Sequence, residues 1–247
     1  MNQIAVIPAR GGSKRILKKN IRVFHGKPVI AYAIEMCIKS KLFSRIIVST
    51  DDVEIAEVAK NFGAEVFFRI DKNVSTDDAP VINVVKEIIS SNNLEIDSDA
   101  ICCIFPCTPL LTADQLIKGY NLLQANTVDF VFPVFNSGLP ISRSLFINSK
   151  GFIEISDKKL INTPTNLLSN AFFDAGQYYW AKTKTWIYAE SILGGNNMAQ
   201  IVNRLSAIDI DNEEDWQLAE ILFSKQSEGE RSVRTKSSRL LGWSIWQ

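Results

Sequence analysis

A glycine-rich, cationic loop directly follows the first apolar stretch of the chain. After the apolar residues 4–8, the sequence ARGGSKRILKK places two glycines, a serine and five cationic side chains between positions 9 and 19. Glycines let backbone amides approach phosphate oxygens, and arginine and lysine form charge-assisted hydrogen bonds with them. The loop is therefore suited to a triphosphate, and composition alone leaves open a solvated basic turn.

The spacing of this loop differs from two common nucleotide motifs. It matches neither GxxxxGK[ST] nor GxGxxG, so the P-loop NTPase and Rossmann dinucleotide interpretations lose their main support. A nucleotide bound here would use another motif.

An acidic constellation lies near residue 210. In IDIDNEEDW, Asp209 and Asp211 flank an apolar residue at the end of a predicted strand, 207–210. Alternation points both carboxylates to one face, where they can hold Mg²⁺ against phosphate oxygens. Alternatively, Asp211 caps the helix that follows. Asp215, about one turn into that helix, is predicted to be solvated.

Strands and helices alternate along the first 135 residues. Hydrophobic patterning predicts strands at 4–8, 45–49, 64–68, 100–105 and 130–135, and helices at 28–40, 53–62, 80–90 and 112–124. This order predicts an α/β fold with a mostly parallel open sheet and helices on both faces. Ligands bind such sheets at the carboxyl ends of strands, which is where the cationic loop falls.

The regular alternation stops after residue 136. Short apolar pieces at 141–147 and 152–155 predict that 136–173 leaves the sheet as a lid or a dimerisation arm. Strands are predicted again at 176–181 and 207–210, followed by a helix at 213–223. We therefore expect a single domain over residues 1–224 and a tail of unassigned role over 225–247.

Charge and composition exclude several classes of function. Lys plus Arg number 27 and Asp plus Glu number 27, so no global field attracts nucleic acid or an anionic membrane. The chain lacks a signal-peptide pattern, and its apolar runs are shorter than the roughly 18 residues that span a bilayer. We expect a soluble cytoplasmic protein that binds neither. The four cysteines are predicted to be buried free thiols, because their spacing does not suit zinc.

Four motifs, in order, resemble the acylneuraminate cytidylyltransferase family. They are IPARGGSKR with the following Lys19 and Asn20, the STDD of 49–52, the Asp77–Asp78 pair before a helix, and IDIDNEEDW. The resemblance covers about residues 1–224 and implies the Rossmann-like fold of nucleotide-diphospho-sugar transferases. It also implies that an anomeric sugar hydroxyl attacks the α-phosphorus of CTP and pyrophosphate leaves.

Two segments favour one branch of this family. FDAGQYYW at 173–180 and Phe105 in FPCTPLL, where the sialic acid enzymes tend to have a glutamine, are most similar to the pseudaminic acid cytidylyltransferases. The same reaction on legionaminic acid, Neu5Ac or Kdo is the nearest alternative. An alternative of another class is a catalytically silent nucleotide-binding protein, which would have no need for a Mg²⁺ site.

The resemblance also implies roles for individual residues. Nucleotide-binding roles fall on Ala9, Arg10, Gly11, Gly12, Ser13, Asn20, Arg69 and Asp78. Catalytic roles fall on Lys14, Arg15, Lys19, Asp209 and Asp211, and the two aspartates would hold Mg²⁺, the expected cofactor. Sugar-binding roles fall on Phe105, Arg143, Asp174, Gln177 and Tyr178. The expected partners are CTP, a nonulosonic acid and a second copy of the chain, whose site the arm would reach.

Some of these side chains have ordinary structural alternatives. Alternation sends Tyr178 and Tyr179 to opposite faces of a strand, so at least one of them packs in the core. Arg143 can equally be an exposed loop arginine, and the single histidine, His25, is predicted to be structural. The general base is then a metal-bound hydroxide or a site carboxylate, for which Asp209 is the candidate.

Overall fold

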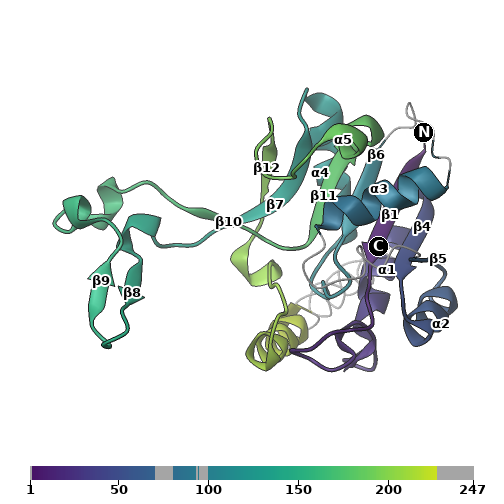
Figure 1. Ribbon diagram of the computed structural model, residues 1–247, viewed down its shortest axis with the longest axis horizontal. Coiled ribbons are helices and arrows are strands. Elements are labelled where there is room, and N and C mark those ends of the chain that lie inside the picture. Colours follow the sequence, from purple (N-terminus) through teal and green to yellow (C-terminus); the bar gives the residue numbers. More distant parts are fainter. Residues whose placement is uncertain (1, 70–79, 93, 95–99, 227–247) are drawn as a thin grey trace, which may run out of the picture.

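The computed structural model describes residues 2–69, 80–92, 94 and 100–226. Its main strands are β1 (Gln3–Pro8), β4 (Phe43–Thr50), β5 (Glu65–Phe68), β6 (Ala100–Ile104), β7 (Phe130–Asn136), β10 (Phe172–Asp174), β11 (Tyr178–Lys182) and β12 (Met198–Ile201). They form one sheet in the order β10-β7-β11-β6-β1-β4-β5, and β12 pairs with β7 (Figure 1).

The sheet is parallel around its first strands. β1 lies parallel to both β4 and β6, β4 is parallel to β5, and β12 is parallel to β7. β11 runs antiparallel to β6 and β7, and β10 runs antiparallel to β7. The predicted α/β fold with a largely parallel sheet is confirmed, and the antiparallel strands are those that follow the excursion from the sheet.

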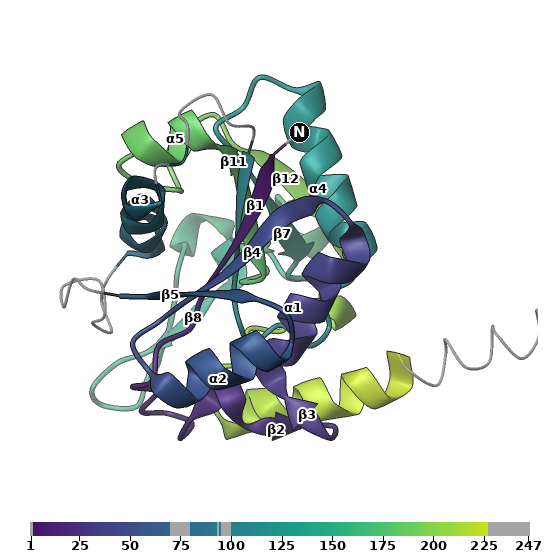
Figure 2. The ribbon, with the colours of Figure 1, turned by 90° about the vertical axis from the view of Figure 1, so that its right-hand side faces the viewer.

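Helices cover both faces of the sheet. The helices α1 (Val29–Ser40), α2 (Val53–Asn61) and α4 (Ala113–Ala125) lie on one face, and α3 (Val81–Ser91) and α5 (Thr183–Tyr188) lie on the other (Figure 2). Ala5 and Ile7 pack toward the first group, whereas Ile4 and Val6 pack toward the second. Because both faces are covered, β1 must be apolar throughout, which explains its continuous hydrophobic run.

A third cluster packs under the cationic loop. A helix over 213–226 lies against the hairpin of β2 (Val23–Phe24) and β3 (Lys27–Pro28). The ring of Phe24 makes edge contacts with Trp216 and Phe223, at centroid distances of 5.5 and 5.4 Å. The same cluster buries Ile16 of the loop and Ile210 of the acidic segment, so one aromatic core supports both predicted ligand-binding segments.

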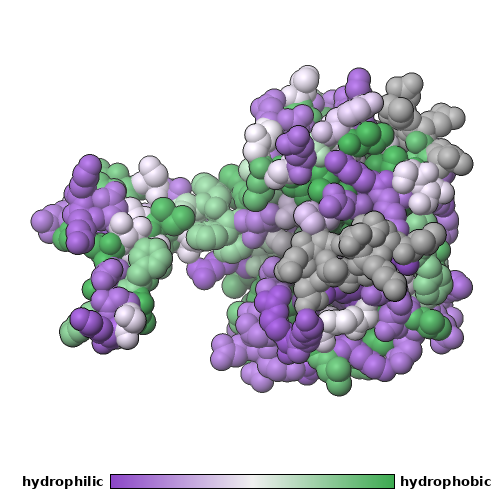
Figure 3. Space-filling view, in the orientation of Figure 1, coloured by the Kyte–Doolittle hydropathy of each residue, from purple (hydrophilic) through white to green (hydrophobic). Residues whose placement is uncertain are grey.

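Between β7 and β10 the chain projects away from the sheet (Figure 1). This arm contains the short hairpin of β8 (Leu145–Ile147) and β9 (Ile153–Ile155) and three short 3₁₀ turns, η3 (Ile141–Arg143), η4 (Lys158–Leu160) and η5 (Thr165–Leu167). Apolar side chains gather on its surface (Figure 3). On the hairpin, Leu145, Ile147 and Ile153 are 59%, 77% and 68% exposed.

One predicted strand is wrong, and several elements were not predicted. Residues 207–210 form no strand; the strand that follows α5 is β12 at Met198–Ile201, which pairs with β7. The short elements β2, β3, α5 and β12 carry too little periodicity to be recognised. None of the helices in the described part of the chain has the length and apolar character that a membrane span requires.

The four cysteines are buried and unpaired, as predicted. Burial raises the pKa of the Cys107 thiol to about 12, so it is protonated at neutral pH.

Candidate active site

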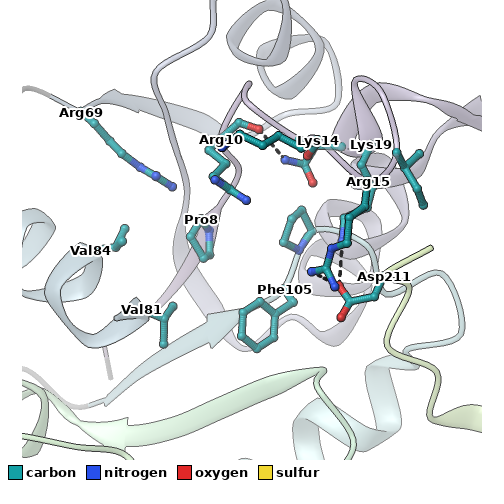
Figure 4. A pocket seen from close by; sticks show the side chains of 14 residues that line it. Pro8, Arg10, Lys14, Arg15, Lys19, Arg69, Val81, Val84, Phe105 and Asp211 are labelled. Carbon is teal, nitrogen blue, oxygen red and sulfur yellow. Dashed lines mark hydrogen bonds and ion pairs between the residues drawn. The ribbon is translucent and has the colours of Figure 1, made fainter. Parts of the chain in front are cut away.

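A pocket lies where the parallel strands end. Pro8 closes β1, Arg69 follows β5 and Phe105 follows β6, and all three line the pocket (Figure 4). The remaining lining residues are Arg10, Ser13, Lys14, Arg15, Ile16, Lys19, Asn20, Val81, Val84, Pro106 and Asp211. The pocket is therefore at the predicted edge of the sheet, and five cationic side chains, those of Arg10, Lys14, Arg15, Lys19 and Arg69, surround it.

The cationic loop is anchored through its backbone. The Ala9 amide donates to the Ser49 carbonyl at 2.8 Å, and the Gly11 amide donates to Asp51 Oδ1 at 2.9 Å. Asn20 is buried and its Nδ2 donates to the Arg10 carbonyl at 2.8 Å. The path of the loop is thus fixed from both sides, which leaves the cationic side chains to face the pocket.

The two glycines of the loop have different surroundings, although composition predicted the same role for both. The prediction gave the amide of Gly11 to a phosphate, but in this structure Asp51 accepts its hydrogen bond. A Cβ at Gly11 would lie 2.8 Å from Asp52 Cβ, so the glycine is required by the neighbouring turn. No atom of the described chain lies within 4 Å of a Cβ built on Gly12, and Gly12 remains open toward a ligand.

Arg69 forms the opposite side of the pocket (Figure 4). Its Nε donates to Ser49 Oγ at 3.0 Å and its Nη2 donates to the Ser49 carbonyl at 3.1 Å. Burial lowers the pKa of Arg69, opposed by the charge of Asp51. Since an arginine stays protonated even then, Arg69 is a partly desolvated positive charge that an anion would stabilise.

Asp211 supplies a carboxylate to the pocket lining. Its Oδ1 accepts from Arg15 Nη2 at 2.8 Å and lies 3.6 Å from Lys19 Nζ. The helix cap is formed by its neighbours: Asn212 Oδ1 accepts from the amides of Glu214 and Asp215. The interpretation of Asp211 as a helix cap is therefore wrong.

Asp215 was predicted to be solvated, and this prediction is also wrong. Its Oδ2 accepts from the amides of Asp211 and Asn212, at 3.0 and 3.1 Å. Together with Asn212 it closes the first turn of the helix in the manner of a capping box, which holds the backbone of Asp211 in place.

Asp209 and Asp211 lie near each other although they are not on a strand. Burial raises the pKa of Asp209, and the charge of Asp211 raises it further. A Cβ at Gly176 would lie 3.0 Å from Asp209 Cγ, and the φ of Gly176 is +60°, so a glycine is needed there. The two aspartates therefore lie close enough to interact, although 207–210 is not a strand.

The pair of aspartates has the donor chemistry that a magnesium ion uses. The charge of Asp211 raises the pKa of Asp209, which shows that the two carboxylates lie near each other, and Mg²⁺ takes one or two carboxylates together with water and phosphate oxygens. Within the described residues, no group of three or more His, Cys, Asp or Glu side chains could hold a metal ion. Among the described residues, Asp209 and Asp211 are thus the two carboxylates proposed as ligands, and a bound triphosphate could supply further oxygen atoms.

Four of the five predicted sugar-binding residues do not line the pocket of their own chain; they are Tyr178, Gln177, Arg143 and Asp174. Tyr178 is fully buried and its hydroxyl bonds to the Gln115 carbonyl and to Gln200 Oε1. Gln177 is 1% exposed and its Nε2 donates to the Ser206 carbonyl at 2.6 Å. Within a single chain both side chains are therefore turned into the core, where their polar groups bond to Ser206, Gln115 and Gln200.

Arg143 is the third of these residues. It lies on the arm, where its guanidinium donates to the carbonyls of Ile161 and Thr163. The arm projects from the sheet (Figure 1), and within one protomer Arg143 is not among the residues that line the pocket. Asp78, predicted to lie near the nucleotide, is outside the described residues.

Tyr179 is a residue that the sequence interpretation missed. Its hydroxyl donates to Asp174 Oδ2 at 2.5 Å, and its ring contacts Phe105 at a centroid distance of 5.8 Å. Asp174 also accepts from the Gly176 amide at 2.9 Å. Alternation indicated that Tyr178 and Tyr179 face opposite ways, and it is Tyr179 that contacts Phe105, a residue of the pocket lining.

Comparison with known proteins gives a consistent result. The model of the cytidylyltransferase family matches residues 4–166. The chain is 36% identical over 231 residues to the pseudaminic acid cytidylyltransferase of Campylobacter jejuni, covering 92% of this chain and 99% of that one. It is 29% identical to the CMP-N,N'-diacetyllegionaminic acid synthase of Legionella pneumophila, again covering 92% of this chain and 99% of the other.

Solved structures share the fold. A CMP:2-keto-3-deoxy-manno-octonic acid synthetase complexed with CTP aligns with a TM-score of 0.66 at 14% identity, covering 92% of this chain and all of that one. A 4-diphosphocytidyl-2C-methyl-D-erythritol synthase aligns with a TM-score of 0.61 at 14% identity, over 90% of this chain and 98% of the other. At this identity the likeness concerns the fold.

Proposed function

Because this chain belongs to the cytidylyltransferase family, we propose that it transfers CMP from CTP to a nonulosonic acid, with pseudaminic acid as the substrate. The observation that carries the proposal is the pocket at the strand ends, in which five cationic side chains face one space. That arrangement complements a triphosphate. The 36% identical relative named for pseudaminic acid supports the choice of sugar. In this proposal the protein works in the cytoplasm, where CTP is available.

The chemistry asked of the residues is mainly positioning and charge neutralisation. The anomeric hydroxyl oxygen of the sugar forms a bond to the α-phosphorus, and the bond from that phosphorus to the pyrophosphate oxygen breaks. Lys14, Arg15 and Lys19 lie on one side of the pocket and stabilise the negative charge that gathers on pyrophosphate. Arg10 and Arg69 hold the triphosphate from the other side.

We further propose Mg²⁺ as the cofactor, held by Asp209 and Asp211. When bound, it would neutralise charge on the phosphate oxygens. Arg15 and Lys19 hold the Asp211 carboxylate in a fixed orientation within the pocket. Asp209 lies beside it, and its raised pKa makes it our candidate acceptor for the proton of the sugar hydroxyl.

The sugar end of the site is assigned to Phe105, Asp174 and Tyr179. Phe105 lines the pocket and its ring contacts that of Tyr179, whose hydroxyl donates to the Asp174 carboxylate behind it. A carboxylate held in this way can accept hydrogen bonds from sugar hydroxyl and acylamino groups, while the rings contact apolar parts of the sugar.

The two adjacent tyrosines give a matched pair of substitutions. Tyr178→Phe is expected to lower the free energy of unfolding by about 1–3 kcal/mol, because it removes a donor from buried partners, and to leave the KM for the sugar unchanged. Tyr179→Phe is expected to raise that KM several-fold with a smaller loss of stability. Urea unfolding and initial rates measure both, and a raised sugar KM in Tyr178→Phe alone would reverse the assignment.

We also propose that the protein is a homodimer formed through the arm. Leu145, Ile147 and Ile153 form one apolar face of the β8–β9 hairpin and remain exposed in a single chain. Exposed apolar patches of this kind are typical of protein interfaces. In a dimer the arm would bring Arg143 to the site of the other chain, where a guanidinium suits the sugar carboxylate.

Replacing the cross-strand pair Ile147 and Ile153 by serine is expected to shift the solution mass from dimer to monomer at micromolar concentration. Light scattering after gel filtration measures the mass, and circular dichroism checks that the sheet remains folded. The control is Leu193→Ser, which removes a side chain of similar exposure, 63%, outside the arm. A monomeric mass for the unsubstituted protein would refute the dimer.

The reaction is tested by pyrophosphate release from CTP and Mg²⁺ with pseudaminic acid, legionaminic acid, Neu5Ac and Kdo in parallel. Turnover with pseudaminic acid alone is expected. Turnover with another sugar in its place would change the substrate. Absence of turnover with all four, in a protein that binds CTP, would favour a silent nucleotide-binding scaffold.

A further inference from the structure

The STDD segment at 49–52 has no role in the reaction as described, yet it contacts both sides of the pocket. It forms the end of β4 and the turn into α2, between the cationic loop and Arg69. We propose that Ser49 is a positioning residue, which aims the Arg69 guanidinium at the triphosphate and ties it to the cationic loop. The proposal rests on the proposed function, in which the pocket binds CTP.

Ser49 makes a two-point contact with Arg69. Its Oγ accepts from Nε at 3.0 Å and its carbonyl accepts from Nη2 at 3.1 Å. The Arg69 amide also donates to the Thr50 carbonyl at 2.9 Å. Backbone and side chain of Arg69 are therefore both fixed by two consecutive residues, so the orientation of the guanidinium is set before any ligand arrives.

The same short segment fixes the loop on the other side. The Ser49 carbonyl accepts from the Ala9 amide at 2.8 Å, and Asp51 Oδ1 accepts from the Gly11 amide at 2.9 Å. Asp52, meanwhile, caps α2 by accepting from the amides of Glu54 and Ile55. The Asp52 cap fixes residues 49–52 to the start of α2. These residues in turn fix the distance between Arg69 and the cationic loop.

Because Ser49 is buried and Arg69 is partly buried, the orientation of Arg69 should affect how tightly the triphosphate binds. Ser49 is fully buried, and Arg69 is desolvated enough to lower its pKa. A flexible arginine loses rotamer freedom when it binds an anion, whereas a pre-oriented one has already lost it on folding. Removing the Ser49 hydroxyl should therefore weaken binding of the triphosphate without removing any group that touches it.

A double-mutant cycle separates positioning from a general effect on the fold. Dissociation constants for CTP with Mg²⁺, without sugar so that no turnover occurs, are measured by calorimetry for the unsubstituted protein, Ser49→Ala, Arg69→Ala and the double variant. Ser49→Ala is expected to weaken CTP binding about 5- to 10-fold, and to have no further effect once Arg69 is alanine. Ser44→Ala, at the other end of β4, is the matched control and should bind CTP normally.

A second variant covers the case in which Ser49→Ala does not fold. Arg69→Lys keeps the charge but cannot make the two-point contact, and should weaken CTP binding by a similar factor. Equal weakening by Ser49→Ala with and without Arg69, or normal binding by a folded Ser49→Ala, would overturn the proposal. Repeating the cycle with tripolyphosphate separates the role of Ser49 from the proposed function. Binding of tripolyphosphate but not of CTP would refute the proposed function, and the cycle with tripolyphosphate would still decide the role of Ser49.

Discussion

Replacing Asp211 with asparagine is expected to lower kcat by about 10²–10³-fold. Asp211 lines the pocket and accepts from Arg15, and Lys19 lies nearby. The substitution keeps the size of the side chain but removes the charge that would hold Mg²⁺ and orient the two cations. Losing one such electrostatic contact costs about 2–4 kcal/mol of barrier. Pyrophosphate release at saturating CTP, Mg²⁺ and sugar measures the effect.

The matched control for Asp211 is Asp114→Asn. Asp114 is an exposed carboxylate in the first turn of α4, where it pairs with Lys118 at 2.8 Å. Its replacement makes the same chemical change outside the pocket, so kcat should stay within about twofold, as is usual for surface substitutions. If Asp211→Asn retained full kcat with intact magnesium dependence, Asp211 would have no part in the reaction.

Features encoded by neighbouring residues were the ones that the sequence predicted well. The cationic loop has its charges and glycines within eleven positions, and it follows β1 directly, so its place at the strand end follows from the strand alone. Asp52 begins α2, and Gly63, at a φ of +92°, follows its end. In these cases local propensity and capping decide the structure.

Features that depend on distant pairing were not accessible from the sequence. Whether Tyr178 or Tyr179 faces the site depends on how β11 pairs with β6 and β7, and periodicity fixes only that they face opposite ways. Asp209 and Asp211 interact although the predicted strand does not exist; Asp209 lies against Gly176, and the Asp211 amide donates to Asp215. The two carboxylates thus lie together as predicted, but not through the predicted strand, and their role stays a prediction.

The surroundings of Gly11 also depend on a distant segment, the turn at Asp52, and they predict a large effect of substitution. Composition predicts that both loop glycines let the backbone approach a phosphate, but in the structure the two have different surroundings. A Cβ on Gly11 would lie 2.8 Å from Asp52 Cβ, while a Cβ on Gly12 would meet open space. Gly11→Ala must therefore move either the loop or the cap of α2, and Gly12→Ala need move neither.

Gly11→Ala is expected to lower kcat/KM for CTP by about 10²-fold, since a displacement of about 1 Å in a positioned group has a cost of that order. It should also lower the free energy of unfolding by about 1–3 kcal/mol, through crowding against the turn and weakening of the Asp52 cap. Gly12→Ala is the matched control for stability and should unfold like the unsubstituted protein. Initial rates and urea unfolding on both variants measure these effects. If the two variants proved equally stable and equally active, the contact between the loop and the Asp52 turn would not constrain the site, and the case for the 49–52 segment as its frame would weaken with it.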